Sequence, residues 1–166
     1  PLNYVVSGTE HRDDIRTPTG AAFRRGDAIL PNILDELFRT RERAKLDSDE
    51  VASQAIKILM NSFYGVLGTS GCRFHNPDIA NSITGLGRHF LLWSKAWFEK
   101  AGFRVVYGDT DSVFVSSGID DSRAALDEGN KLTALINADL ALHVRDTWHV
   151  ESRLELEFEK LYRRLF

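Results

Sequence analysis

The fold is decided by residues 103–115, which read FRVVYGDTDSVFV. Two runs rich in β-branched and aromatic residues, 103–107 and 112–115, flank a short polar segment that begins at Gly108. Runs of this kind favour extended strands, and a short segment of Gly and Asp between them is typical of a tight turn. The stretch therefore predicts a β-hairpin.

Two carboxylates lie in this predicted hairpin. If the chain is extended there, Asp109 and Asp111 leave the same face, roughly 6 to 7 Å apart at about 3.3 Å per residue. Neighbouring carboxylates repel each other unless a cation lies between them, and Mg²⁺ prefers a few carboxylates together with water and phosphate oxygens. The alternative is a polar turn that uses Asp for its turn-forming ability, and the pattern alone leaves that alternative open.

Helical periodicity precedes the hairpin. A first helix is predicted over about 31–46, and a second begins near Asp47, which lies three residues before Glu50 at capping-box spacing. A glycine-rich passage, 65–71, ends the second helix. The two helices are expected to form an antiparallel hairpin.

The second helix has two distinct faces. Apolar residues at helical spacing predict a buried face, made of Ile56, Leu59, Met60 and Phe63. A polar line lies about 100° around the helix, made of Lys57, Asn61 and Tyr64. A Lys ammonium suits phosphate, an aromatic ring can stack on a base or sugar, and Gly65 either admits a close backbone approach or caps the helix.

The first helix carries a basic window over residues 39–45, in which Arg41 and Lys45 are one turn apart. The window has a net charge of +3 from four basic residues and Glu42. A solvated helix surface is the alternative interpretation, because charge runs usually face water.

The remaining pattern predicts an α+β fold. A long helix is expected over about 78–100, another over about 122–145, and a last strand over 154–159, whereas residues 1–30 are expected to be irregular or weakly structured. The long helix is expected to bury Trp93 and Trp97. The later helix is expected to turn four residues inward, Leu132, Leu135, Ile136 and Leu140.

Composition excludes several classes of protein. The chain has 166 residues, 43% apolar and 27% charged, which suits one globular domain, and no apolar run approaches the roughly 18 residues of a membrane helix. Cys72 is the only cysteine, so no internal disulfide is possible and a nucleophilic role is not expected. The net charge of −3 is unusual for a nucleic-acid binder, but the acidic excess lies after residue 115. The five histidines are not expected to form a metal site, because none pair at metal-ligand spacing.

Two motifs resemble those of family B DNA polymerases. Residues 57–65, KILMNSFYG, are similar to the family's fingers motif, and residues 107–112, YGDTDS, to its palm motif. Arg41 and Lys45 match a basic pair on the preceding fingers helix, and residues 154–159 resemble a palm strand. The stretch 61–82 is most similar to bacterial members. The resemblance covers about residues 30–162 and implies helical-hairpin fingers over 31–66 and a partial palm with the catalytic hairpin and flanking helices over 67–166, after the opening segment 1–30, on which it is uninformative.

The resemblance also implies roles for single residues. The triphosphate of an incoming deoxynucleotide would be held by Arg41, Lys45 and Lys57, with Asn61 beside them, while Tyr64 and Gly65 would pack against the nascent base pair. Two Mg²⁺ ions would be bound by Asp109 and Asp111, and Glu157 would lie near them. Asp111 is the stronger candidate for direct coordination.

The implied activity is DNA-directed DNA synthesis on primer-template DNA with deoxynucleoside triphosphates, in a bacterial cytoplasmic protein that contacts no membrane. A sliding clamp would be a partner through the parent protein. The family's earlier palm motif with a further catalytic Asp is absent before Pro31, so we expect a fragment that cannot polymerise alone. The alternative is a non-catalytic nucleic-acid-binding or scaffold module derived from such a polymerase.

Overall fold

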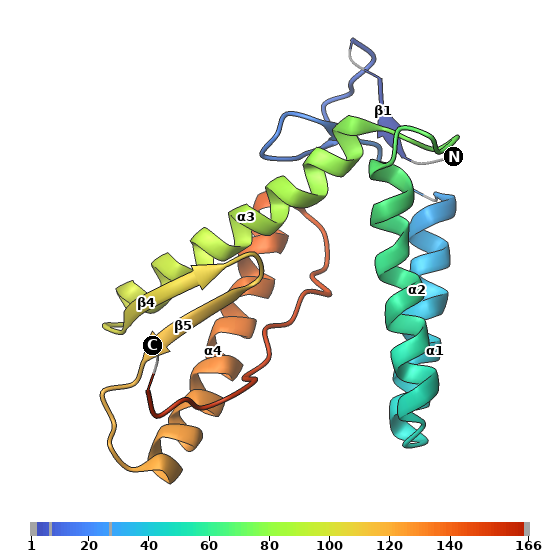
Figure 1. Ribbon diagram of the computed structural model, residues 1–166. Coiled ribbons are helices and arrows are strands. Elements are labelled where there is room, and N and C mark those ends of the chain that lie inside the picture. Colours follow the sequence, from blue (N-terminus) through green and yellow to red (C-terminus); the bar gives the residue numbers. More distant parts are fainter. Residues whose placement is uncertain (1–2, 7, 27, 165–166) are drawn as a thin grey trace. The chain divides into compact units, whose positions relative to one another are not determined.

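The computed structural model describes residues 3–6, 8–26 and 28–164, and it confirms a mixed α+β fold (Figure 1). Contacts divide the chain into two compact units, Pro1–Leu86 and Gly87–Phe166, so each unit is described by itself. Among the described residues, no helix combines the length and apolarity that a membrane crossing needs.

The first unit opens with a small antiparallel sheet. Its strands are β1 (Tyr4–Val5), β2 (Ile15–Arg16) and β3 (Ala22–Phe23), with β3 in the middle. The prediction of an irregular or weakly structured segment over 1–30 did not specify these short strands. Strands of two residues are too short to leave an alternating pattern in the sequence.

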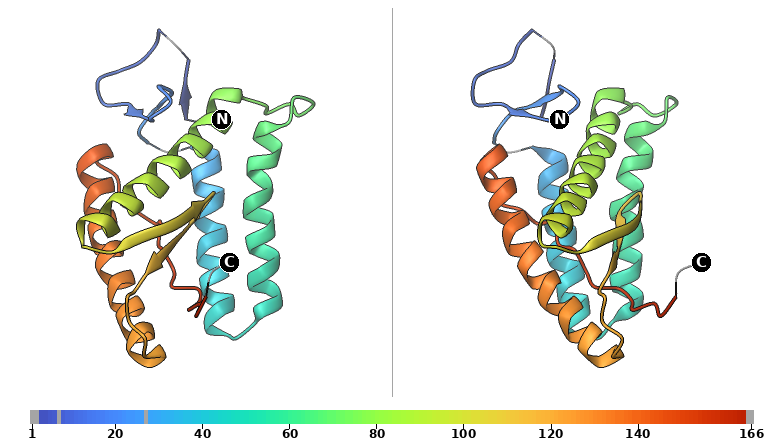
Figure 2. Two further views of the ribbon diagram at one scale, coloured as in Figure 1. Left: turned by 60° about the vertical axis from the view of Figure 1, so that its left-hand side comes forward. Right: turned by 90° about the vertical axis from the view of Figure 1, so that its left-hand side faces the viewer.

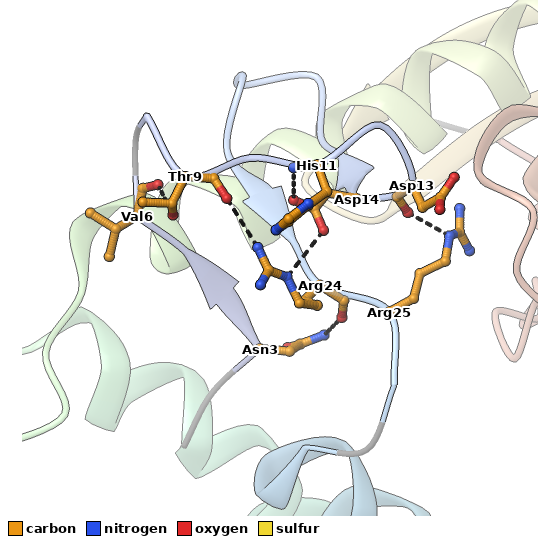
Figure 3. A network of polar contacts seen from close by, with 8 residues as sticks. All are labelled: Asn3, Val6, Thr9, His11, Asp13, Asp14, Arg24 and Arg25. Atoms are coloured by element: carbon orange, nitrogen blue, oxygen red, sulfur yellow. Dashed lines mark hydrogen bonds and ion pairs between the residues drawn. The ribbon is translucent and has the colours of Figure 1, made fainter.

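Side chains hold the loops around this sheet together (Figure 3). Asp14 accepts a hydrogen bond from the backbone N–H of His11 at 2.7 Å and pairs with the Arg24 guanidinium at 3.4 Å. The hydrogen bond from the His11 N–H is the main cause that lowers the pKa of the Asp14 carboxyl, and Arg24 lowers it further. Arg24 also donates to the carbonyl of Thr9 at 3.0 Å, so one guanidinium holds two points of the loop between β1 and β2.

The predicted helical hairpin is confirmed: α1 (Ile29–Leu46) and α2 (Glu50–Gly68) lie antiparallel, side by side in all views (Figure 2). The predicted cap is wrong, because Asp47 ends α1 whereas Asp49 caps α2 by accepting from the Ala52 N–H at 2.9 Å. Helix α2 also continues through Gly65. Of its predicted buried face, Leu59 is 50% exposed.

Helix α3 (Pro77–Lys100) follows and crosses the boundary between the two units. Near its start, the hydroxyl of buried Ser82 lies 3.3 Å from that of Thr17 and 3.2 Å from that of Thr19. Gly85 lies one turn further on, where the Thr19 methyl group occupies the space that a Cβ would take. The helix therefore contacts the loop before β3 without room for a larger residue.

The second unit contains the predicted β-hairpin, β4 (Arg104–Asp109) and β5 (Ser112–Ser116), and then α4 (Ser122–Trp148). Ile136 and Leu140 of α4 are buried as predicted, but Leu135 is 56% exposed because it lies on the outer side of the same helix.

The predicted last strand over 154–159 is absent from the described residues, which are irregular from residue 149 onward. A side chain replaces the missing strand partner: the Asn137 amide donates to the carbonyl of Leu156 at 2.9 Å and accepts from its N–H at 2.8 Å. Phe158 then lies against Gly129, where its ring is 2.9 Å from the position of a Cβ. Thus α4 holds this segment at two points.

Candidate nucleotide and metal site

The two predicted metal ligands lie at the tip of the β4–β5 hairpin. Asp109 is the last residue of β4 and pairs with Ser112, so Thr110 and Asp111 form a two-residue turn. Thr110 has a φ of 51°, an uncommon conformation for a β-branched residue, and its hydroxyl donates to Asp109 Oδ1 at 3.0 Å. The predicted geometry of two aspartates on straight extended chain is therefore wrong, because the backbone turns between them.

Both carboxylates are exposed, which suits a hard cation that keeps water or phosphate oxygens in its remaining positions. The chemistry of these two donors fits Mg²⁺, although they would supply only part of its coordination shell. Within the described part of the chain, no three His, Cys, Asp or Glu side chains gather around a point that could hold a metal ion. The structure thus does not bring Glu157, which is exposed in the segment after α4, into such a group.

The polar line on α2 lies on the exposed side of the helical hairpin. Lys57 and Asn61 are exposed, and Tyr64 is 45% exposed. Apart from the backbone of α2 and the residues adjacent to Gly65, no described atom lies within 4 Å of the position of a Cβ at Gly65, so the helix surface is open there. A phosphate, base or sugar could approach these side chains without displacing others.

The two basic residues of α1 differ in their surroundings. Lys45 forms an exposed ion pair with Glu42 at 2.8 Å, and the Lys45 ammonium lowers the pKa of the Glu42 carboxyl. Such an exposed pair contributes little and can be exchanged for another anion. Arg41 is half-buried, and its Nε has no hydrogen-bond partner among the described residues.

The site residues belong to different units. The basic and polar side chains of α1 and α2 lie in the first unit, and the hairpin aspartates lie in the second.

Sequence reasoning missed two features. One is the strained backbone of Thr110, which no pattern in the amino-acid sequence indicates. The other is a histidine pair: the Nε2 atoms of His89 and His143 are 3.1 Å apart, which the prediction about metal-ligand spacing did not address. These residues are 54 positions apart, so no local spacing could reveal them.

Comparison with known proteins establishes the family. A family model described as DNA polymerase family B matches residues 12–166. The chain belongs to DNA polymerase family B. This finding confirms the resemblance that the two motifs indicated.

Relatives in family B agree with this assignment. DNA polymerase II of Escherichia coli (strain K12) is 41% identical over 159 residues, which cover 93% of this chain and 20% of that protein. The DNA polymerase delta catalytic subunit of Caenorhabditis elegans is 33% identical, with 93% of this chain and 16% of that protein covered. The family B DNA polymerase structure from Pyrobaculum calidifontis matches with a TM-score of 0.60 and 25% identity, covering 90% of this chain and 20% of that chain. The chain thus spans about a fifth of the length of these family B polymerases.

Proposed function

We propose that the chain forms the fingers and part of the palm of a DNA-directed DNA polymerase. The reaction is the transfer of a nucleotidyl group from a deoxynucleoside triphosphate to the 3′-hydroxyl of a primer paired with template DNA. The observation that carries this proposal is the pair of exposed carboxylates, Asp109 and Asp111, at a hairpin tip within the stretch that matches the family.

Asp109 and Asp111 are the residues that would hold Mg²⁺, with Asp111 as the stronger candidate for direct coordination. When bound, two such ions would lower the pKa of the primer hydroxyl and neutralise charge on the leaving pyrophosphate. Thr110 supports this role, because its hydroxyl donates to Asp109 Oδ1 and holds that carboxylate at the turn. A further carboxylate for the metal ions stays a prediction, and Glu157 or a residue outside this chain would supply it.

The triphosphate is assigned to Arg41, Lys45 and Lys57, with Asn61 beside them. Support comes from the free Nε of Arg41 within the described residues and from the exposure of Lys57. A triphosphate would take the place of Glu42 as the partner of Lys45, since it carries more charge than one carboxylate. Tyr64 and Gly65 would pack against the nascent base pair.

Primer extension by the intact polymerase that contains this chain tests the proposal. Asp111→Asn removes a charged ligand at constant shape, so we expect extension to be abolished while primer-template affinity stays nearly unchanged. Asp120→Asn is the matched control, because Asp120 is an exposed aspartate of the same unit outside the hairpin. Near-normal extension by Asp111→Asn would contradict the metal assignment.

Two further outcomes of the same assay are informative. If the intact wild-type protein binds primer-template DNA without extending it, the non-catalytic alternative is correct. The 166-residue chain by itself is expected to show no extension, because it supplies too few carboxylates for the metal ions.

A further inference from the structure

A row of three aromatic rings crosses the β4–β5 hairpin. The ring centroids of Tyr107 and Phe114 are 5.7 Å apart, and those of Phe114 and Tyr162 are 5.9 Å apart. Distances of this size are typical of interacting aromatic pairs. Tyr107 and Phe114 face each other on the two strands, whereas Tyr162 comes from the irregular segment after α4.

This row shares a face of the hairpin with the first catalytic carboxylate. Tyr107 pairs with Phe114, and Asp109 pairs with Ser112. Side chains two residues apart on a strand, and side chains of directly paired residues, leave the same face of the sheet. Asp109 is therefore next to Tyr107 on the face that carries the aromatic row.

Tyr162 belongs to a segment that contacts α4 at two points before it reaches this face. The Asn137 amide bonds both backbone groups of Leu156, and the ring of Phe158 fits against Gly129 of α4. Four residues beyond Phe158, the ring of Tyr162 reaches Phe114. The path thus runs from α4 through this segment to β5 and the turn.

The exposure of the row agrees with a bracing role. Phe114 is half-buried between the two tyrosines, which are themselves 53% and 54% exposed. A ring with one covering neighbour on each side has fewer available orientations than one that faces water. Two antiparallel strands by themselves are only marginally stable, so a hairpin needs such external packing.

We infer that Tyr162 is a positioning residue for the catalytic hairpin, acting through Phe114 to hold Asp109 and the turn in place. The inference rests on the proposed polymerase activity for its catalytic consequence. Among the described residues, the ring of Tyr162 packs on Phe114, which packs on Tyr107, so its effect on the turn must pass through the aromatic row.

Single-turnover nucleotide incorporation by the intact polymerase tests this inference. Tyr162→Ala is expected to lower the rate of the chemical step between about tenfold and about 100-fold, the scale for a small misplacement of reacting groups. The nucleotide concentration for half-maximal rate and the primer-template affinity are expected to stay the same. Tyr162→Phe keeps the ring and should restore the rate, and Arg163→Ala, at the next and exposed position, serves as the matched control.

A merely structural role gives a different result. If Tyr162→Ala only unfolded part of the protein, active-site titration would show fewer active molecules with an unchanged rate for each one. That result, or a wild-type rate in Tyr162→Ala, would overturn the inference.

A second measurement is independent of activity. In the 166-residue chain, Tyr162→Ala is expected to speed amide hydrogen exchange at the β4–β5 pairs near the turn, and Tyr162→Phe is not. Unchanged exchange at Asp109 and Ser112 would overturn the inference even if the protein proved to be inactive. If the wild-type polymerase fails to extend primers but the exchange rates change as expected, the proposed function fails while the bracing role stands.

Discussion

His89 and His143 form an unusual pair of single residues within the second unit. Their Nε2 atoms are 3.1 Å apart, and their ring planes differ by 14°. One ring must donate an N–H while the other accepts, so the pair holds one proton between its two facing nitrogens. Trp93 stacks on His143, and Trp148 lies edge-on to His89.

This pair predicts a pH dependence of stability. Burial, and then the neighbouring His143, lower the pKa of His89 below its ordinary value of 6.5. The folded state therefore binds fewer protons than the unfolded state. The stabilising contribution is complete above about pH 6.5 and is lost as the pH falls through that value toward the lowered pKa.

Urea unfolding followed by tryptophan fluorescence measures this effect. The midpoint is expected to fall between about pH 7.5 and about pH 5.5, and His89→Gln should reduce that fall. His11→Gln is the matched control, because the His11 side chain is exposed in the other unit. Equal pH dependence in wild type and His89→Gln would contradict the prediction. Asp139, the acidic residue one turn before His143, is bonded to the Trp97 N–H at 2.7 Å.

At the residue scale, the positions of the candidate residues were predictable and their geometry was not. Residue type and spacing placed Asp109 and Asp111 in a hairpin, and their metal-binding role stays a prediction that rests on the family resemblance. The geometry of the turn between them could not be predicted, since only the backbone shows that Thr110 has positive φ. The ion pair of Lys45 with Glu42 was available from their i, i+3 spacing, although the sequence analysis did not use it.

Helix α3 offers a direct comparison of two glycines at the scale of one element. A Cβ at Gly85 would collide with the methyl group of Thr19, whereas, apart from the backbone of α3 and the adjacent residues, no described atom lies within 4 Å of one at Gly87. Thr19 cannot turn away freely, because its hydroxyl lies 2.9 Å from that of Thr17 and 3.2 Å from that of Ser82.

The two glycine-to-alanine changes are therefore expected to have opposite effects. Gly87→Ala should raise the free energy of unfolding by about 1 kcal/mol, the usual advantage of Ala over Gly inside a helix. Gly85→Ala should lower it by about 1 to 3 kcal/mol, because the added methyl group forces the loop of Thr19 outward. Urea unfolding followed by far-UV circular dichroism measures both. A similar gain in both variants would show that the loop moves without cost.

Elements that carry a long periodic pattern of apolar residues were predicted well. Short strands, and the segment whose hydrogen-bond partner is a side chain, were not. The helices α1, α2, α3 and α4 and the hairpin follow from apolar spacing and turn residues, with ends within a few positions. The alternating residues 154–158 resemble a strand, but the described chain gives them the Asn137 side chain as partner in place of a neighbouring strand. An alternating sequence pattern indicates which face of a segment is apolar. It does not indicate which other part of the chain will bond to the backbone N–H and C=O groups of that segment.

At the scale of the whole molecule, the contacts separate residues up to Leu86 from those that follow. The chain's three tryptophans, Trp93, Trp97 and Trp148, all lie in the second unit. Tryptophan fluorescence therefore reports on that unit, whereas far-UV circular dichroism reports on the helices of both.

This distribution allows a test of cooperativity. In Gly85→Ala, the far-UV transition is expected to begin at a lower urea concentration, while the midpoint of the fluorescence transition stays close to that of the wild type. Compact units of one chain can open separately, which is the physical reason for this expectation. A common shift of both signals would mean that the chain unfolds as one cooperative unit.

The two hydrogen bonds between the Asn137 amide and the backbone of Leu156 also have a consequence for biosynthesis. During synthesis, the ribosome adds Asn137 to the chain first, and Leu156 follows 19 residues later. At about 5 to 20 residues per second, this interval is about one to four seconds. During that interval the Asn137 amide can bond only to water or to transient partners, and Gly129 leaves its side of the nascent helix uncovered. We therefore expect the segment after α4 to become ordered only once α4 has formed, because Asn137 and Gly129 of that helix are its contacts.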